Sequence, residues 1–303
     1  MADRPDFGDL LEPGFRKIFD DKYAEVPQVM EQVFHVNDSS KQDEKDSAVS
    51  GFGYLVLTPP GGAISYEDPV QMYDKTYTHL KYTKGFKVTR ELYEDDQYNV
   101  IKKKPAALGR AARRTSENQA ALVLVRAFNS SYLGGDAQEL ASTVHPRADG
   151  GSSQSNASAV GLTLTEPNLE TARLAMRNQL DDKGMKIDAV ANTIIVPIDL
   201  EKTAHLIVDS TLRQGTGDND ANFYKGSLKI VPWIYLTSAT AWFLMDSSLH
   251  ELNWFWRVRP EFQQDDAFDT DVALFKVRER FSAGWSDWRG FWGSKGDGAA
   301  YSG

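Results

Sequence analysis

The chain contains no cysteine and only five histidines among its 303 residues. Without cysteine it cannot form a disulfide, a thiolate nucleophile, or a cysteine-ligated zinc or iron–sulfur centre. The histidines are scattered singly, with none of the i, i+3 or i+4 pairs that bind a metal from one helix face. We therefore expect no metal and no cofactor, and stability that comes from packing or from assembly.

Long apolar runs and targeting signals are also missing. No run approaches the roughly 20 apolar residues that span a bilayer, and Met1 to Asp6 do not form the basic and apolar regions of a secretory signal. We therefore expect a soluble, intracellular product without a membrane partner. The formal net charge of -9 disfavours a general basic surface that grips nucleic acid.

The familiar catalytic signatures do not occur. The chain lacks a Walker-type phosphate loop, a Gly-x-Gly-x-x-Gly helix start, a Gly-x-Ser-x-Gly elbow and a His-Glu-x-x-His pair. The acidic stretch that begins at Asp218 imitates a calcium loop, but Phe223 stands where glycine is required and Lys229 where a bidentate glutamate is needed. No enzyme class is indicated.

One histidine lies near a serine and an aspartate. Ser142, His145 and Asp149 fall within one loop-like segment and could be imagined as a catalytic triad. A triad is defined by geometry, and proximity in a loop does not supply it. The favoured interpretation is a loop histidine that caps backbone groups.

The N-terminal third is predicted to contain an unusual β-extension. An amphipathic stretch at 15–33 and a polar run at 37–46, expected to be a loop, precede the turn sequence Pro59-Pro60-Gly61-Gly62. Residues 64–88 are rich in Tyr and Thr and alternate like long β-structure with few large aliphatics. Such a strand pair cannot bury much surface alone, so it is an ordinary surface hairpin, lies flat on a neighbouring lobe, or reaches another subunit. The residues that would contact another subunit are Tyr66, Tyr73, Lys75, Tyr77 and Lys81.

A long helix is predicted from Pro105 to Phe128, extending back to Gln97 if Pro105 only kinks it. Its expected apolar stripe consists of Leu108, Ala111, Thr115, Leu122 and Val125, with Arg110, Arg113, Arg114 and Glu117 pointing elsewhere. The arginines and residues 102–104 form a basic cluster, which is either solvated, paired with carboxylates of a neighbouring molecule, or in weak contact with DNA. We include Arg110, Arg113 and Arg114 among the candidate inter-subunit contacts.

The remaining segments predict an α+β fold. A helix at 166–182 capped by Thr165, a strand at 192–198 and a helix at 200–210 capped by Asp199 come first. Strand-like segments follow at 228–236, 241–245, 252–258 and 272–281, the last after an acidic turn at 265–271. This order is not the repeated βαβ of a doubly wound sheet.

The C-terminal tail is rich in tryptophan. Trp285, Trp288 and Trp292 lie within a glycine-rich segment that is too short to bury all three by itself. They either cover the core where the chain ends or form a contact between subunits, where aromatic residues are enriched. The sequence favours neither alternative, and Trp285 and Trp288 are kept as candidate contacts.

The order of these segments resembles the Hong Kong 97-type phage capsid fold, and three stretches are similar to Mu-like major head subunits. They are Gly134-Gly135-Asp136 through His145-Pro146 to Ser155-Asn156, then Ile194-Ile195-Val196-Pro197, and finally Val277-Arg278 through Asp287-Trp288-Arg289-Gly290. The resemblance implies an N-terminal arm at 1–45, an extended loop at 46–96, a peripheral domain at 97–164 and 262–303, and an axial domain at 165–261. It also implies that the extended loop lies across a neighbouring subunit.

The function that the resemblance implies is that of a major capsid protein of a tailed double-stranded DNA phage. Copies would form the pentamers and hexamers of an icosahedral shell, assembled in the host cytoplasm and found in the virion. The implied partners are a separate scaffold protein, a portal, a decoration protein and packaged DNA without sequence-specific contacts. Two alternatives remain open: an encapsulin-like nanocompartment shell, and a soluble enzyme with an unrecognised site in residues 165–261.

Overall fold

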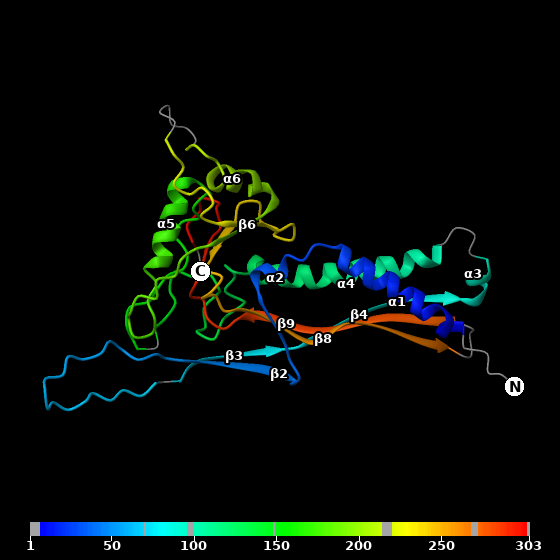
Figure 1. The fold of residues 1–303 in the computed structure, drawn as a ribbon, viewed down its shortest axis with the longest axis horizontal. Coiled ribbons are helices and arrows are strands. Elements are labelled where there is room, and N and C mark those ends of the chain that lie inside the picture. Colours follow the sequence, from blue (N-terminus) through cyan, green and yellow to red (C-terminus); the bar gives the residue numbers. More distant parts are fainter. Residues whose placement is uncertain are drawn as a thin grey trace.

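A computed structural model describes residues 7–69, 71–95, 100–147, 149–213, 220–267 and 272–301. Figure 1 shows three parts: a long lobe of strands and helices, a compact lobe at one end of it, and an extended hairpin loop that projects beyond both. Helices and largely antiparallel sheets are mixed without a repeated βαβ order. This is the α+β class that the sequence predicted.

The long lobe is a four-stranded sheet with helices packed on one face. The sheet has the order β1-β8-β9-β4, in which only the β1–β8 pair is parallel among the described strands. Its elements are α1 (Phe7–Glu25), α2 (Met30–Val33), β1 (His35–Asp38), β4 (Leu80–Thr89), α3 (Arg90–Glu94), α4 (Val100–Val125), β8 (Leu252–Ala267) and β9 (Val272–Trp285). Aromatic side chains fill the space between α1, α4 and the sheet: Phe15, Phe19, Phe262 and Phe275.

Helix α4 is the predicted long helix, and Pro105 lies inside it without ending it. The side of the helix that faces the core is shifted by about one residue from the predicted apolar stripe. The buried positions include Leu108, Ala112, Ser116, Ala120 and Leu124, whereas Ala111, Thr115, Leu122 and Val125 are only partly buried. Arg113 and Glu117, expected to point elsewhere, are buried. The stripe was predicted from apolar residues alone, but a polar side chain can face the core when it finds partners there.

The compact lobe holds a second four-stranded sheet, in the order β10-β7-β5-β6. Its elements are α5 (Glu166–Arg177), β5 (Thr193–Val196), α6 (Ile198–Val208), β6 (Lys229–Pro232), β7 (Trp242–Met245) and β10 (Phe291–Ser294). Every residue of β5 is buried, as expected of an inner strand. The Thr165 hydroxyl caps α5 by accepting a hydrogen bond from the backbone N–H of Asn168. Helix α6 begins before Asp199, with Pro197 rather than Asp199 at its cap position.

The chain passes between the two lobes at points other than those expected. Strand β8 begins at Leu252 and belongs to the long sheet, so the compact lobe ends before the expected boundary at Glu261. The last strand, β10, pairs with β7, and Trp292 belongs to the core of the compact lobe. The C-terminal segment therefore contributes to both lobes.

The extended loop is rooted in an antiparallel hairpin of β2 (Asp43–Val49) and β3 (Gln71–Thr78). Two expectations are corrected here. The polar run at 37–46 is not simply a loop, because it supplies the end of β1 and the start of β2; pairing of exposed strands uses the backbone and tolerates polar side chains. Residues 64–69 do not belong to a strand, and regular pairing starts at Gln71.

The predicted acidic turn at 265–271 is only partly described by the structure. Residues 265–267 continue β8 instead of forming a turn, and 268–271 lie outside the described residues.

Candidate subunit-contact surface

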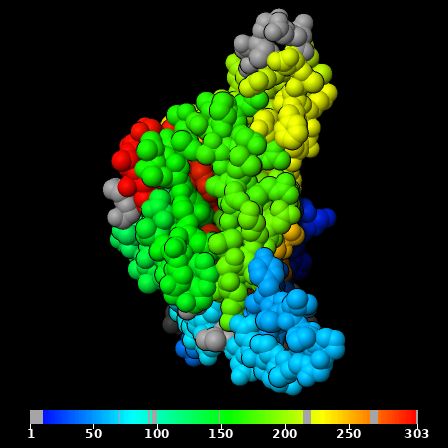
Figure 2. All heavy atoms as spheres, turned by 90° about the vertical axis from the view of Figure 1, so that its left-hand side faces the viewer, coloured from blue at the N-terminus to red at the C-terminus, as the bar shows by residue number. Residues whose placement is uncertain are grey.

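The tip of the extended loop, residues 51–69, exposes an unusual number of apolar side chains. Leu55 is 100% exposed, Leu57 96% and Tyr66 89%. The same loop also exposes Phe52, Tyr54, Val56 and Ile64. In Figure 2 the loop stands out from the rest of the surface as a blue and cyan projection. Contiguous exposed apolar surface of this kind marks a site of interaction.

A tight turn reverses the chain at the tip. The backbone N–H of Gly62 donates to the carbonyl oxygen of Pro59 at 2.9 Å. Gly61 adopts φ +78°, in the left-handed region that favours glycine. The predicted Pro-Pro-Gly-Gly turn is therefore confirmed, and it joins the two apolar arms of the loop.

Ion pairs fix the loop where it leaves the body. Lys45 Nζ lies 2.6 Å from Asp74 Oδ2 across the β2–β3 hairpin, and this contact helps lower the pKa of Asp74 to about 2. Farther out, Glu67 pairs with Lys183 of the compact lobe at 2.5 Å and accepts the backbone N–H of Gly53 at 2.9 Å. The loop is thus positioned by polar contacts while its apolar side chains stay uncovered.

At its base, the hairpin packs on its own chain. Tyr77 is buried, its hydroxyl lies 2.6 Å from Ser286 Oγ, and burial raises its pKa to about 12. Lys75 Nζ donates to the carbonyl oxygen of Leu133 at 2.6 Å and lies 5.1 Å from the ring centroid of Trp285. The hydroxyl of Tyr73 donates to the carbonyl oxygen of Pro146 at 3.4 Å. Of the predicted contacts in this segment, Tyr66 and Lys81 are exposed, whereas Tyr77 faces its own chain.

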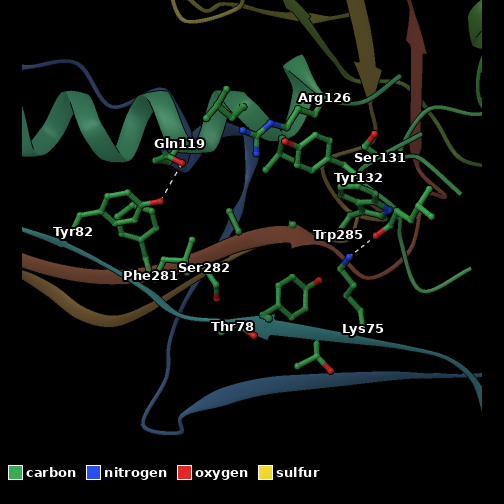
Figure 3. A pocket seen from close by; sticks show the side chains of 18 residues that line it. Lys75, Thr78, Tyr82, Gln119, Arg126, Ser131, Tyr132, Phe281, Ser282 and Trp285 are labelled. Carbon is green, nitrogen blue, oxygen red and sulfur yellow. Dashed lines mark hydrogen bonds between the residues drawn. The ribbon is translucent and has the colours of Figure 1, made fainter. Parts of the chain in front are cut away.

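Beside this base lies a pocket of about 390 Å³, the base pocket. It is bounded by β3, the start of β4, the end of α4, the following loop and β9, as the labelled side chains in Figure 3 show. Tyr82 stacks on Phe281 with ring centroids 4.7 Å apart, and its hydroxyl donates to Gln119 Oε1 at 3.2 Å. The guanidinium of Arg126 lies 4.2 Å from the ring centroid of Tyr132. The pocket is therefore lined by rings with cations among them.

The tryptophans of the tail cover the core of their own chain. Trp285, Trp288 and Trp292 are all buried. Trp288 stacks on His145 with ring centroids 4.3 Å apart. This arrangement matches the core-covering alternative of the two that the sequence left open. It leaves these rings little exposed surface, although Trp285 also lines the base pocket.

The predicted basic cluster on α4 is not one surface. Arg110 lies 3.5 Å from Glu25 of α1, and Arg114 is exposed. Arg113 turns into the core, where its guanidinium lies 4.0 Å from the ring centroid of Tyr23. Adjacent residues of a helix point about 100° apart, so a run of arginines in the sequence need not share a face. A contact with another subunit remains a prediction for Arg110 and Arg114.

The triad imagined around His145 does not form. The ring nitrogens of His145 lie 2.6 Å from Asp136 Oδ2 and 3.0 Å from Asn156 Oδ1, and Asp149 pairs with Arg147 instead.

Among the described residues, no group of three or more His, Cys, Asp or Glu side chains is arranged to hold a metal. In the same part of the chain, no helix is long and apolar enough to cross a membrane.

A family model described as phage capsid protein matches residues 73–294, which is well over half of the chain. The chain belongs to the phage capsid protein family. The protein is therefore a capsid subunit. No curated protein sequence matches this capsid protein significantly.

Solved structures share the Hong Kong 97-type fold of the capsid protein at low sequence identity. The procapsid of bacteriophage JBD30 matches with 19% identity and a TM-score of 0.52, over 94% of this chain and 74% of that chain. The JBD30 capsid decorated with minor capsid protein trimers matches with 19% identity and a TM-score of 0.56, over 78% and 100%. A virus-like particle from Pyrococcus furiosus matches with 10% identity and a TM-score of 0.57, over 92% and 97%.

Sequence reasoning found Tyr66 but missed the other apolar residues of the loop tip. The signal was present in Gly51-Phe52-Gly53-Tyr54-Leu55-Val56-Leu57, an apolar run directly before a turn. An apolar run is ordinarily a buried strand. Only the fold shows that this apolar run lies outside the three hydrophobic clusters and projects beyond both lobes.

Proposed function

We propose that this capsid protein is the major head subunit of a tailed double-stranded DNA bacteriophage, and that its copies form the pentamers and hexamers of an icosahedral shell. The observation that carries the proposal is the exposed apolar tip of the extended loop. Fully burying a single Leu side chain is worth about 1.5–3 kcal/mol. Covering Leu55 and Leu57 with another copy would therefore give assembly a large favourable contribution.

The proposal gives separate roles to four parts of the chain. Residues 1–45 act as an N-terminal arm and 46–96 as the extended loop that lies across a neighbour. The rest of the long lobe, without residues 1–96, is the peripheral domain, and the compact lobe is the axial domain that meets its copies at the five- and six-fold axes. The role of the loop is supported by its projection away from its own chain.

Finer assignments extend the proposal. We place the protein with Mu-like head subunits, because the stretches at 134–156, 194–197 and 277–290 are similar to theirs. We further propose a separate scaffold protein, a portal and a decoration protein as partners, with assembly in the host cytoplasm around packaged DNA. A JBD30 capsid of the same fold carries minor capsid protein trimers, which supports a decoration partner.

The role is proposed to be structural rather than catalytic, in keeping with the family. The alternative of a nanocompartment shell stays open, because a shared fold does not show what a shell encloses. A nanocompartment subunit would enclose a protein cargo, whereas a phage head subunit encloses DNA. Portal and terminase genes beside the coding sequence would support the phage, and an adjacent cargo enzyme gene would support the compartment.

The test is assembly of the chain expressed alone and together with its neighbouring scaffold gene, observed by negative-stain electron microscopy. We expect icosahedral particles or aberrant shells. Leu55→Asp with Leu57→Asp should abolish them, because charges would replace the apolar tip, while the control Ser65→Asp adds a charge to the same loop without removing an apolar side chain. A wild-type chain that stays monomeric under all assembly conditions contradicts the proposal.

A further inference from the structure

The base pocket has the size and lining of a receptor for an aromatic side chain. An engineered apolar protein cavity of about 150 Å³ is large enough to bind benzene, and the base pocket measures about 390 Å³. The rings of Tyr82, Tyr132, Phe281 and Trp285 surround it. Such a pocket can seat one aromatic ring and leave room for its neighbours.

Two cations of the pocket wall form no ion pair with a carboxylate among the described residues. Lys75 contacts a backbone carbonyl and the Trp285 ring, and Arg126 lies over Tyr132. Burial lowers the pKa of Lys75, with a weaker opposing effect of Asp136. Partly buried cations that form no direct ion pair favour an occupant that brings a carboxylate.

The loop tip offers an aromatic ring next to a carboxylate. Tyr66 is 89% exposed, and Asp68, two residues further on, is also exposed. The intervening Glu67 is already engaged by Lys183 and Gly53. Asp68 follows Tyr66 by only two residues on the same exposed segment, so the two side chains can reach one site together.

The loop cannot place Tyr66 in the base pocket of its own chain. Lys75 lies in the pocket wall on β3, and the strand from Lys75 back to Gln71 leads about 13 Å away from it, at about 3.3 Å per residue. Residues 51–69 form a hairpin loop that projects outward from that end of the strand (Figure 1). Only a second copy can bring a loop tip to this pocket.

We infer that the base pocket of one copy receives Tyr66 and Asp68 from the extended loop of a second copy, with the ring among the pocket's aromatic side chains and the carboxylate at Arg126 or Lys75. This inference rests on the proposed function, because it names the surface that the loop contacts on its neighbour. The loop of one copy and the base pocket of another would together form one inter-subunit contact.

The absence of cysteine makes the contact directly testable. Ser65→Cys introduces the single thiol of the chain, next to Tyr66 and on an exposed position. The thiol is labelled with a maleimide benzophenone, isotopically heavy and light copies are co-assembled, and irradiated particles are digested and analysed by mass spectrometry. We expect adducts that join one copy's loop to the other copy's peptides at 119–126 or 131–133. Ser40→Cys, also exposed but remote from the tip, should not label those peptides.

A second measurement separates the ring from the loop as a whole. Tyr66→Phe should assemble like the wild type, because the ring remains, whereas Tyr66→Ala should raise the concentration needed for assembly about tenfold, the effect of losing one aromatic contact. Adducts between copies that map outside the base pocket, or equal assembly of the two variants, overturn the inference while the proposed function stands. Failure of the wild type to assemble overturns the proposed function itself.

Discussion

Glu279 provides a sharp test of how the long lobe is held together. It lies on β9 and faces the core, with 2% of its surface exposed. Its Oε2 atom has no hydrogen-bond partner among the described residues. Burial raises the pKa of Glu279 to about 8, and the nearby Arg113 guanidinium opposes this only in part. The side chain is therefore mainly neutral in the folded protein at pH 7.

The sign of the pH effect follows from this raised pKa. The folded protein binds the Glu279 proton more tightly than the unfolded chain, in which the pKa is about 4.5. The stabilisation is complete below that value and is lost as the pH rises through about 8. One pKa unit corresponds to about 1.4 kcal/mol, so between pH 5 and pH 7 this one group should lower the unfolding free energy by about 2–3 kcal/mol.

Glu279→Gln keeps the shape of the side chain but cannot ionise. We expect the unfolding free energy of the variant minus that of the wild type to be about 2–3 kcal/mol larger at pH 7 than at pH 5. Urea unfolding of the unassembled subunit, followed by tryptophan fluorescence at both pH values, measures this difference. The control Glu91→Gln makes the same substitution at an exposed position of α3. Equal pH responses of the two variants would refute the reasoning.

Three further changes test other parts of the fold. Gly109→Ala should destabilise the protein by about 1–3 kcal/mol in urea unfolding, because its methyl group would meet the carbonyl oxygen of Phe19 at 2.5 Å and push α1 away from α4. Thr165→Ala should cost about 1 kcal/mol through loss of the cap of α5. Burial against the stacked ring of His35 lowers the pKa of His250 to about 4. The stability contributed by the neutral form of His250 should therefore be complete above pH 6.5 and lost as the pH falls toward 4. Between these pH values, the melting temperature of His250→Gln should fall less than that of the wild type.

Several elements could be predicted because local chemistry determines them. The cap at Thr165, the strand around Ile195 and the strand that begins at Leu252 all appear as expected. Each depends on a pattern within a few residues. The same is true of the turn at the loop tip.

The features that could not be predicted depend on distant partners. Glu117 is buried because it accepts hydrogen bonds from the backbone N–H groups of Val29 and Met30, nearly ninety positions away in the chain. Arg113 is buried because Tyr23 of α1 lies against it. Neither partner is visible in the sequence of α4, so a polarity pattern alone assigned both residues to the wrong face. The base pocket likewise joins segments from β3 to β9.

Folding and assembly are separable in this subunit. The buried residues group into three hydrophobic clusters, and none of the described clusters contains a residue of the loop tip at 51–69. Substitutions at Leu55, Leu57 or Tyr66 should therefore leave the unfolding free energy nearly unchanged, because these side chains are exposed in the folded monomer. The same substitutions should alter assembly strongly, because the apolar surface of the tip becomes buried only against another copy. A loop variant that unfolds more easily than the wild type would show that the tip packs on its own chain and would argue against the role proposed for it.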